Sequence, residues 1–154
     1  MQPRLFTTQQ TELTSDDYYT PRWIFDALGL HFDLDVASPP HPTHVPCDRY
    51  YTQADDGLNA DWYGRVWMNP PFSHCAPWVE RWLSHGNGVT LLPCVKHSLW
   101  TETLWSSDAK CAFVNAKPIW FWNGEKKKQI WPIVWLWAIG SDNIAALHNF
   151  GHVR

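Results

Sequence analysis

The eight residues RVWMNPPF, numbers 65–72, combine a short apolar segment with a rigid turn. Residues 65–68 predict a buried strand, and the two prolines then end it, because proline fixes φ and lacks a backbone N–H. Asn69 therefore stands where the chain leaves the carboxyl end of a strand. Open α/β sheets bind ligands at that edge. The stretch predicts both a central strand and a candidate binding site.

The chemistry of this site follows from four consecutive residues: a carboxamide, two prolines and an aromatic ring. They are Asn69, Pro70, Pro71 and Phe72. The carboxamide of Asn69 and a backbone carbonyl of the proline pair, that of Pro70, are acceptors that can converge on one planar NH₂ group. Two such hydrogen bonds draw the nitrogen toward tetrahedral geometry and free its lone pair for attack on an electrophilic methyl group. Phe72 offers a ring beside the amine. The pattern indicates transfer of a methyl group to an exocyclic amine.

The chain before this motif predicts two further elements. Thr20 is a suitable N-cap and Pro21 a favoured first helical residue, so we expect a short helix that Gly29 ends. A strand follows and ends in Asp35. The segment 38–46 holds four prolines, which exclude a helix there.

The remaining elements complete an alternating pattern of strands and helices. An Asn-Gly pair at 123–124 separates two Trp-rich runs and predicts a hairpin between them. The alternation predicts an α/β sheet that is mainly parallel, with one antiparallel hairpin strand. We expect residues 1–15 to be a flexible arm and 16–154 a single domain. Strands are expected at 49–52, 88–93, 112–114, 118–122 and 130–139, and helices at 76–84 and 97–106.

Composition narrows the class of protein. Of 154 residues 45% are hydrophobic and 12 are Trp, which excludes low-complexity disorder. The apolar run 131–140 is shorter than the roughly 20 residues of a membrane span, so no membrane partner is expected. The N-terminus lacks the apolar core of a signal peptide, and the four cysteines form no CxxC pair. These features favour a reduced, cytoplasmic protein.

Charge is distributed unevenly along the chain. The net charge of −3 argues against a strongly basic DNA-wrapping protein. Residues 1–95 carry five Lys and Arg against eleven Asp and Glu, whereas residues 96–154 carry seven against four. We expect Lys126, Lys127 and Lys128 to lie in the loop of the predicted hairpin, beside the same sheet edge as Asn69. This loop is the candidate contact for a polyanion.

Three polar positions fall at predicted strand ends: Asp35, the pair Asp55 and Asp56, and Asn69. The carboxyl ends of parallel strands share one edge, so these side chains should lie close together. Asp35 would serve the sulfonium or amino end of a cofactor. One acid of the pair would accept from an adenine amine.

The sequence resembles the bacteriophage DNA N-6-adenine methyltransferases, within the S-adenosylmethionine-dependent amino-methyltransferase superfamily. The resemblance rests on DDYYTPRWIFDAL (16–28), FDLDVAS (32–38), CDRYYTQADDGL (47–58), DWYGRVWMNPPF (61–72) and VTLLP (89–93). It implies a compact Rossmann-like methyltransferase fold. The superfamily's glycine-bearing loop and helix after the first strand are replaced here by the proline-rich segment.

The resemblance also assigns roles to residues. Thr20 and Pro21 would lie near the methionine end of S-adenosylmethionine, and Asp55 or Asp56 would bind its adenine. The Asn69–Phe72 motif would hold the target adenine. The first cofactor motif would consist of Asp35, Val36, Ala37 and Ser38.

The resulting hypothesis is a DNA adenine methyltransferase that uses S-adenosylmethionine. Its DNA would be single-stranded, or double-stranded with the target base flipped out. No separate recognition domain fits in this length, so sequence specificity would be low. The protein would act as a monomer or homodimer in the cytoplasm of a bacterium or phage-infected cell, and no metal is expected. Three alternatives stay open: a cytosine N-4 DNA methyltransferase, a protein glutamine methyltransferase, and a catalytically silent single-strand-binding relative.

Overall fold

The computed structural model describes residues 19–40, 43–96, 98–114, 120–122, 127–129 and 134–154. The predicted arm, residues 1–15, lies outside this part of the chain. Six strands form the main sheet: β1 (Phe32–Asp35), β2 (Cys47–Tyr50), β3 (Val66–Met68), β4 (Gly88–Pro93), β5 (Lys110–Phe113) and β8 (Val134–Ile139).

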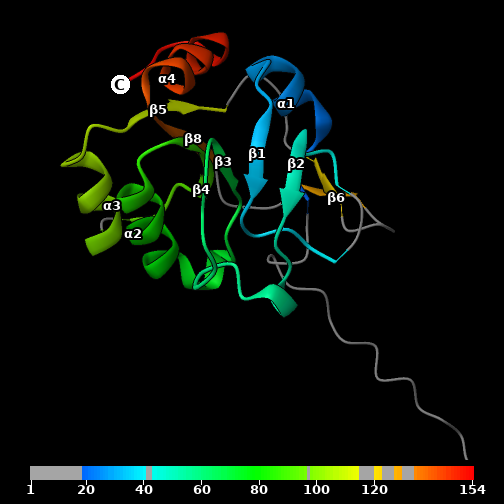
Figure 1. Ribbon diagram of the computed structural model, residues 1–154. Helices are drawn as coiled ribbons and strands as arrows, with labels where there is room; N and C mark the ends of the chain where they lie inside the picture. Colours follow the sequence, from blue (N-terminus) through cyan, green and yellow to red (C-terminus); the bar gives the residue numbers. More distant parts are fainter. Residues whose placement is uncertain (1–18, 41–42, 97, 115–119, 123–126, 130–133) are drawn as a thin grey trace, which may run out of the picture.

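The strand order in the sheet is β2-β1-β3-β4-β8-β5 (Figure 1). β1 pairs in parallel with β2 and β3, and β3 pairs in parallel with β4. β8 runs antiparallel to both of its neighbours, β4 and β5. The sheet is thus mainly parallel with one reversed strand, which confirms the predicted α/β fold class.

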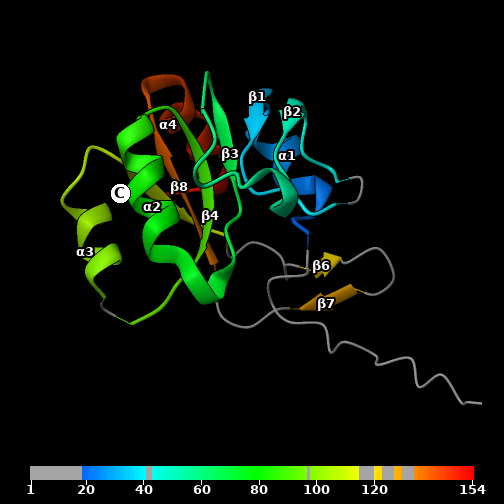
Figure 2. The ribbon, with the colours of Figure 1, turned by 60° about the horizontal axis from the view of Figure 1, so that its bottom comes forward.

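Helices cover both faces of the sheet (Figure 2). Helices α1 (Arg22–Leu28) and α4 (Ser141–Leu147) pack on one face, and α2 (Cys75–His85) and α3 (Leu99–Trp105) pack on the other. Two apolar cores result, one on each side of the strands. Within the described ranges, no helix is long and apolar enough to cross a membrane.

Strand β3 shows how the two cores share one strand. Trp67 points to the α1 side, where its ring meets that of Phe25 edge-on at 4.7 Å between centroids. Val66 and Met68 point to the α2 side. All three residues of the strand are buried. A strand covered on both faces has no solvent face, which explains its unbroken apolar sequence.

Helix α2 follows the proline pair and confirms the helix predicted at 76–84. Its buried residues are Cys75, Val79 and Trp82, spaced four and three apart, so they form one apolar stripe toward the sheet. The helix ends at Gly86, whose φ of 77° lies in the left-handed region that glycine adopts without steric cost.

The connection from β1 to β2 contains no helix in its described residues, 36–40 and 43–46, as the prolines predict. Backbone bonds hold the strand ends together beyond the regular pairing. The Tyr51 N–H donates to the Asp35 carbonyl, and the Ser38 N–H donates to the Tyr51 carbonyl, each at 2.8 Å. The second strand spans 47–50 rather than the predicted 49–52.

The prediction for the Trp-rich hairpin is wrong in one respect. β6 (Trp120–Trp122) pairs with β7 (Lys127–Gln129) in a separate two-stranded sheet (Figure 2), and not with residues 130–139 in the main sheet. The turn signal marks a local antiparallel pair but does not say how far that pair extends. β8 instead lies between β4 and β5, so that both of its edges are already occupied within the main sheet.

Candidate active site

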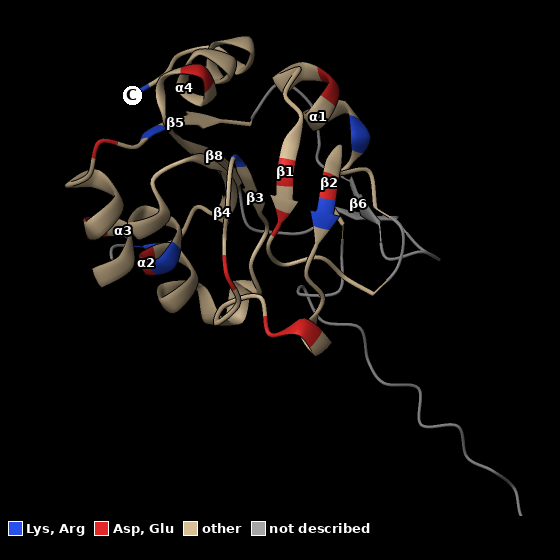
Figure 3. Ribbon diagram, in the orientation of Figure 1, with Lys and Arg blue, Asp and Glu red and all other residues tan. Residues whose placement is uncertain are grey.

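Strands β2, β1 and β3 lie side by side and in parallel, so their carboxyl ends share one edge. Asp35, the last residue of β1, is paired with Tyr50 of β2 and Trp67 of β3. Figure 3 shows acidic residues at the tip of β1 and in the turn that follows β2. Asp35, the turn with Asp55 and Asp56, and Asn69 therefore follow strand ends that share one edge of the sheet.

Asp35 is a buried carboxyl group, with 2% of the residue exposed. Burial raises its pKa from 3.8 to about 7, because desolvation disfavours the ionised form, and a hydrogen bond from the Ala37 N–H opposes this rise. That N–H lies 3.2 Å from Oδ1. Among the described residues, no cationic side chain pairs with Asp35. The following residues, Val36 and Ser38, are also buried.

The acidic turn is held by its own side chains. Asp55 Oδ2 accepts hydrogen bonds from the Thr52 N–H at 2.8 Å and from the Thr52 hydroxyl at 3.0 Å. These bonds lower the pKa of Asp55. Asp56 has a left-handed backbone, with φ of 51°, and both carboxylate oxygens accept from Asn59 Nδ2. Both acids are exposed, so the turn presents negative charge to solvent.

Gly57 brings this turn against the end of β1. A Cβ on Gly57 would lie 2.1 Å from the Val36 carbonyl oxygen, far inside van der Waals contact. The Trp62 indole N–H also donates to the Gly57 carbonyl, at 2.7 Å. Only a residue without a side chain permits this approach. The Asp-Asp-Gly run at 55–57 is the sequence signal for this close approach.

The Asn-Pro-Pro-Phe motif leaves β3 and enters α2 through a 3₁₀ turn, Phe72–His74. The Pro71 carbonyl accepts from the His74 N–H at 3.0 Å, and the Cys75 thiol lies 3.6 Å from the Phe72 carbonyl oxygen. Pro70 is buried, and it follows the last residue of β3, Met68, by two positions.

Asn69 is half-buried, and its amide reaches the segment that precedes α1. Its Nδ2 donates to the Thr20 hydroxyl oxygen at 3.1 Å. Thr20 is therefore not the N-cap that the sequence predicts, because α1 begins at Arg22 with Pro21 in the cap position. The Thr20 hydroxyl bonds to a residue 49 positions away in the sequence. Capping rules consider only neighbouring residues, so they do not predict this contact. Phe72 is half-buried and packs against the core under α1.

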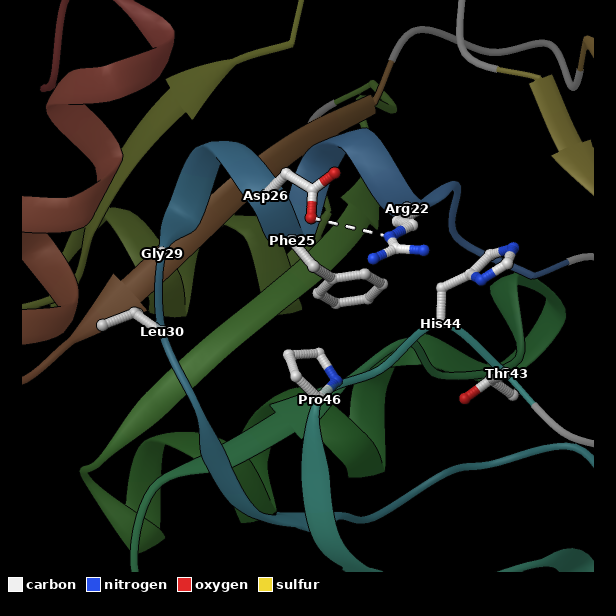
Figure 4. A pocket seen from close by; sticks show the side chains of 8 residues that line it. All are labelled: Arg22, Phe25, Asp26, Gly29, Leu30, Thr43, His44 and Pro46. Atoms are coloured by element: carbon white, nitrogen blue, oxygen red, sulfur yellow. Dashed lines mark ion pairs between the residues drawn. The ribbon is translucent and has the colours of Figure 1, made fainter.

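A separate cavity of about 530 Å³ lies along α1 (Figure 4). Arg22 and Asp26 form an ion pair at its rim, with 3.8 Å between Nε and Oδ1. Leu30 and Pro46, which also line it, precede β1 and β2, so the cavity extends toward the opposite end of these strands. None of the predicted site residues lines this cavity.

The predicted lysine loop is not confirmed. Lys127 and Lys128 belong to strand β7, and Lys126 lies outside the described residues. The side chain of Arg81 is held by contacts within the fold. Its Nη2 donates to the Ala60 carbonyl at 2.8 Å, and its guanidinium lies 5.2 Å from the ring centroid of Trp62.

All four cysteines are free thiols, in different parts of the fold. Burial raises the pKa of Cys47 and of Cys111 to about 11, so both thiols stay protonated near neutral pH. No group of three or more His, Cys, Asp or Glu able to hold a metal occurs in the portion of the chain that the structure describes.

Comparison with known proteins agrees with the geometry. The family described as DNA N-6-adenine-methyltransferase (Dam) matches residues 7–131. The chain is 31% identical to the DNA N-6-adenine-methyltransferase of Haemophilus phage HP1 (strain HP1c1), over 72% of this chain and 74% of that protein. No solved structure matches the chain. With the family matched over most of its length, the chain belongs to the DNA N-6-adenine-methyltransferases.

Proposed function

We propose that this methyltransferase takes its methyl group from S-adenosylmethionine and transfers it to the exocyclic amine of adenine in DNA. The observation that carries the proposal is a pair of acceptors, Asn69 and the Pro70 carbonyl, at the same sheet edge as the buried carboxyl group of Asp35. The acceptors suit an amine, and the carboxyl group suits the cation of the cofactor.

The residues around β1 fit this cofactor. Asp35 is buried with no cationic partner among the described side chains, and an α-ammonium group would supply the missing charge. Val36, Ala37 and Ser38 would line the methionine part, and the backbone segment that contains Thr20 and Pro21 would lie near it. S-adenosylmethionine would contribute an electrophilic methyl group at this edge.

The acidic turn is proposed to hold the adenosine part of the cofactor. Asp55 or Asp56 would accept from the adenine amine. Gly57 packs against the carbonyl of Val36, the residue that follows Asp35. This contact places the turn next to the Asp35 segment and so supports the assignment. Capping of the turn by its own side chains means that its shape exists before a ligand arrives.

The target adenine is proposed to lie on Phe72 with its amine against the motif. Asn69 Oδ1 and the Pro70 carbonyl would each accept one N–H, which localises the lone pair on nitrogen. As the new N–C bond forms, the methyl–sulfur bond breaks, and a proton then leaves the amine to solvent. Pro71 keeps the platform rigid, because both prolines have fixed φ.

Access to the amine requires unpaired adenine. Either the target is single-stranded or the base flips out of the duplex, at a cost of a few kcal/mol that stacking on an aromatic ring partly offsets. Lys126, Lys127 and Lys128 are proposed to contact phosphates. We further propose low sequence specificity, and a monomer or homodimer that works in the cytoplasm.

One experiment tests this proposal and separates its alternatives. The purified chain is incubated with S-adenosylmethionine carrying a deuterated methyl group, with single- and double-stranded DNA and with a protein acceptor. Nucleosides and peptides are then analysed by mass spectrometry. We expect the label on N-6 of adenine. Label on N-4 of cytosine or on glutamine would replace the proposed substrate, and a folded chain that transfers no label would refute the proposal.

A further inference from the structure

The hydrogen bond between Thr20 and Asn69 connects the start of α1 to the motif. Thr20 is 4% exposed, so water does not compete effectively for its hydroxyl group. The oxygen of that hydroxyl accepts from Asn69 Nδ2 at 3.1 Å. Asn69 itself is half-buried. This contact fixes one side of the carboxamide that faces the proposed amine site.

An asparagine amide has a right and a wrong orientation in such a site. Its oxygen accepts hydrogen bonds, and its NH₂ group only donates them. If the Asn69 amide is rotated by 180°, its NH₂ group faces the substrate amine, and two donors then oppose each other. With Nδ2 held by Thr20, Oδ1 is directed away from Thr20 and keeps its lone pairs for the amine. Because a threonine hydroxyl can both donate and accept, Thr20 does not by itself reject the reversed amide; it holds the carboxamide in the orientation that the structure shows. We infer that Thr20 is a positioning residue for the Asn69 side chain.

The backbone on both sides of this contact is fixed, which keeps the Thr20 and Asn69 side chains within hydrogen-bonding distance. Thr20 precedes Pro21, whose ring restricts the conformation of the residue before it. Buried Ile24, Phe25 and Leu28 anchor the helix that follows. On the other side, the Thr90 hydroxyl donates to the Met68 carbonyl at 2.9 Å, one residue before Asn69. The donor and the acceptor therefore sit on separately anchored elements.

This inference rests on the proposed function but assigns the Thr20 side chain to the target amine and not to the cofactor. The two roles predict different kinetic effects. A positioning role lowers kcat at saturating S-adenosylmethionine and leaves the dissociation constant of the cofactor unchanged. A cofactor-binding role raises that dissociation constant.

The test uses Thr20→Val, which keeps the shape and removes the hydroxyl, and Thr20→Ser, which keeps the hydroxyl. We expect kcat to fall about fivefold in Thr20→Val, a typical worth for one hydrogen bond, and to recover in Thr20→Ser. Thr101→Val is the matched control, because Thr101 is also 4% exposed but bonds only within α3 and its cap. It should lose stability and retain kcat.

A second readout does not depend on activity. In ¹⁵N-labelled protein, the side-chain NH₂ signal of Asn69 is assigned by its disappearance in Asn69→Ala. Loss of the hydrogen bond in Thr20→Val should shift that signal, and Thr101→Val should not. An unchanged kcat in Thr20→Val, or weaker cofactor binding with unchanged kcat, overturns the inference. An inactive wild-type chain instead refutes the proposed function.

Discussion

Replacing Asp35 by Asn should stabilise the ligand-free protein while weakening its binding of S-adenosylmethionine. The substitution removes a buried charge and keeps an oxygen that can accept from the Ala37 N–H. In the free protein Asp35 has no cationic partner among the described residues, so its ionised form is costly. In the complex that same charge faces the proposed ammonium group.

The size and direction of the effect follow from the pKa. In the unfolded chain Asp35 ionises near 3.8, and in the folded chain near 7. Below pH 3.8 both states hold the proton and the carboxyl group costs nothing. As pH rises from 3.8 to 7 only the unfolded state ionises, so folding loses stability. Above pH 7 the loss is complete at roughly 4 kcal/mol.

Urea unfolding followed by tryptophan fluorescence measures this directly, because the chain has 12 Trp. Without cofactor, Asp35→Asn should be more stable than wild type at pH 8, by up to about 4 kcal/mol. The difference should shrink as pH is lowered toward 4. Cofactor should stabilise the wild type more than the variant at pH 8. A variant that is less stable at pH 8, or a difference independent of pH, would refute this reasoning.

Two further substitutions test neighbouring parts of the site. Gly57→Ala should lower the free energy of unfolding by about 2 kcal/mol, because its Cβ would collide with the Val36 carbonyl; urea denaturation measures the loss, and wild-type stability would contradict the close packing of the turn. Phe72→Leu keeps apolar volume but removes the ring, so we expect a higher KM for DNA with unchanged cofactor affinity; an unchanged KM would exclude stacking of the base on Phe72.

The features that local sequence predicts well are those set by a few neighbouring residues. The strand at 66–68 and helix α2 follow from apolar spacing and from the proline pair between them. The placement of Asp35, the acidic turn and Asn69 after strand ends at one sheet edge also follows, because it requires only that three strands be parallel and adjacent. The positions of the Asn69–Phe72 motif and of these acidic residues in the fold can therefore be predicted from the sequence.

The features that sequence did not predict depend on contacts between distant segments. Thr20 is of a residue type that favours the N-cap position. Only the folded chain shows that its hydroxyl oxygen accepts a hydrogen bond from Asn69 instead. The Asn-Gly signal predicts a hairpin, yet β8 finds its partners in β4 and β5, both distant in sequence. Such pairings depend on which buried surfaces compete for a strand, and local propensity does not encode that choice.

The most direct test of the account uses Asn69→Ala and measures cofactor binding and methyl transfer in the same preparation. Isothermal titration gives the affinity for S-adenosylmethionine, and labelled-methyl transfer to adenine in DNA gives kcat. We predict that the variant binds the cofactor with wild-type affinity and transfers no detectable methyl group, because the proposal places the Asn69 oxygen on the target amine and not on the cofactor. A variant that still methylates adenine at the wild-type rate would contradict the central claim that this motif holds the amine.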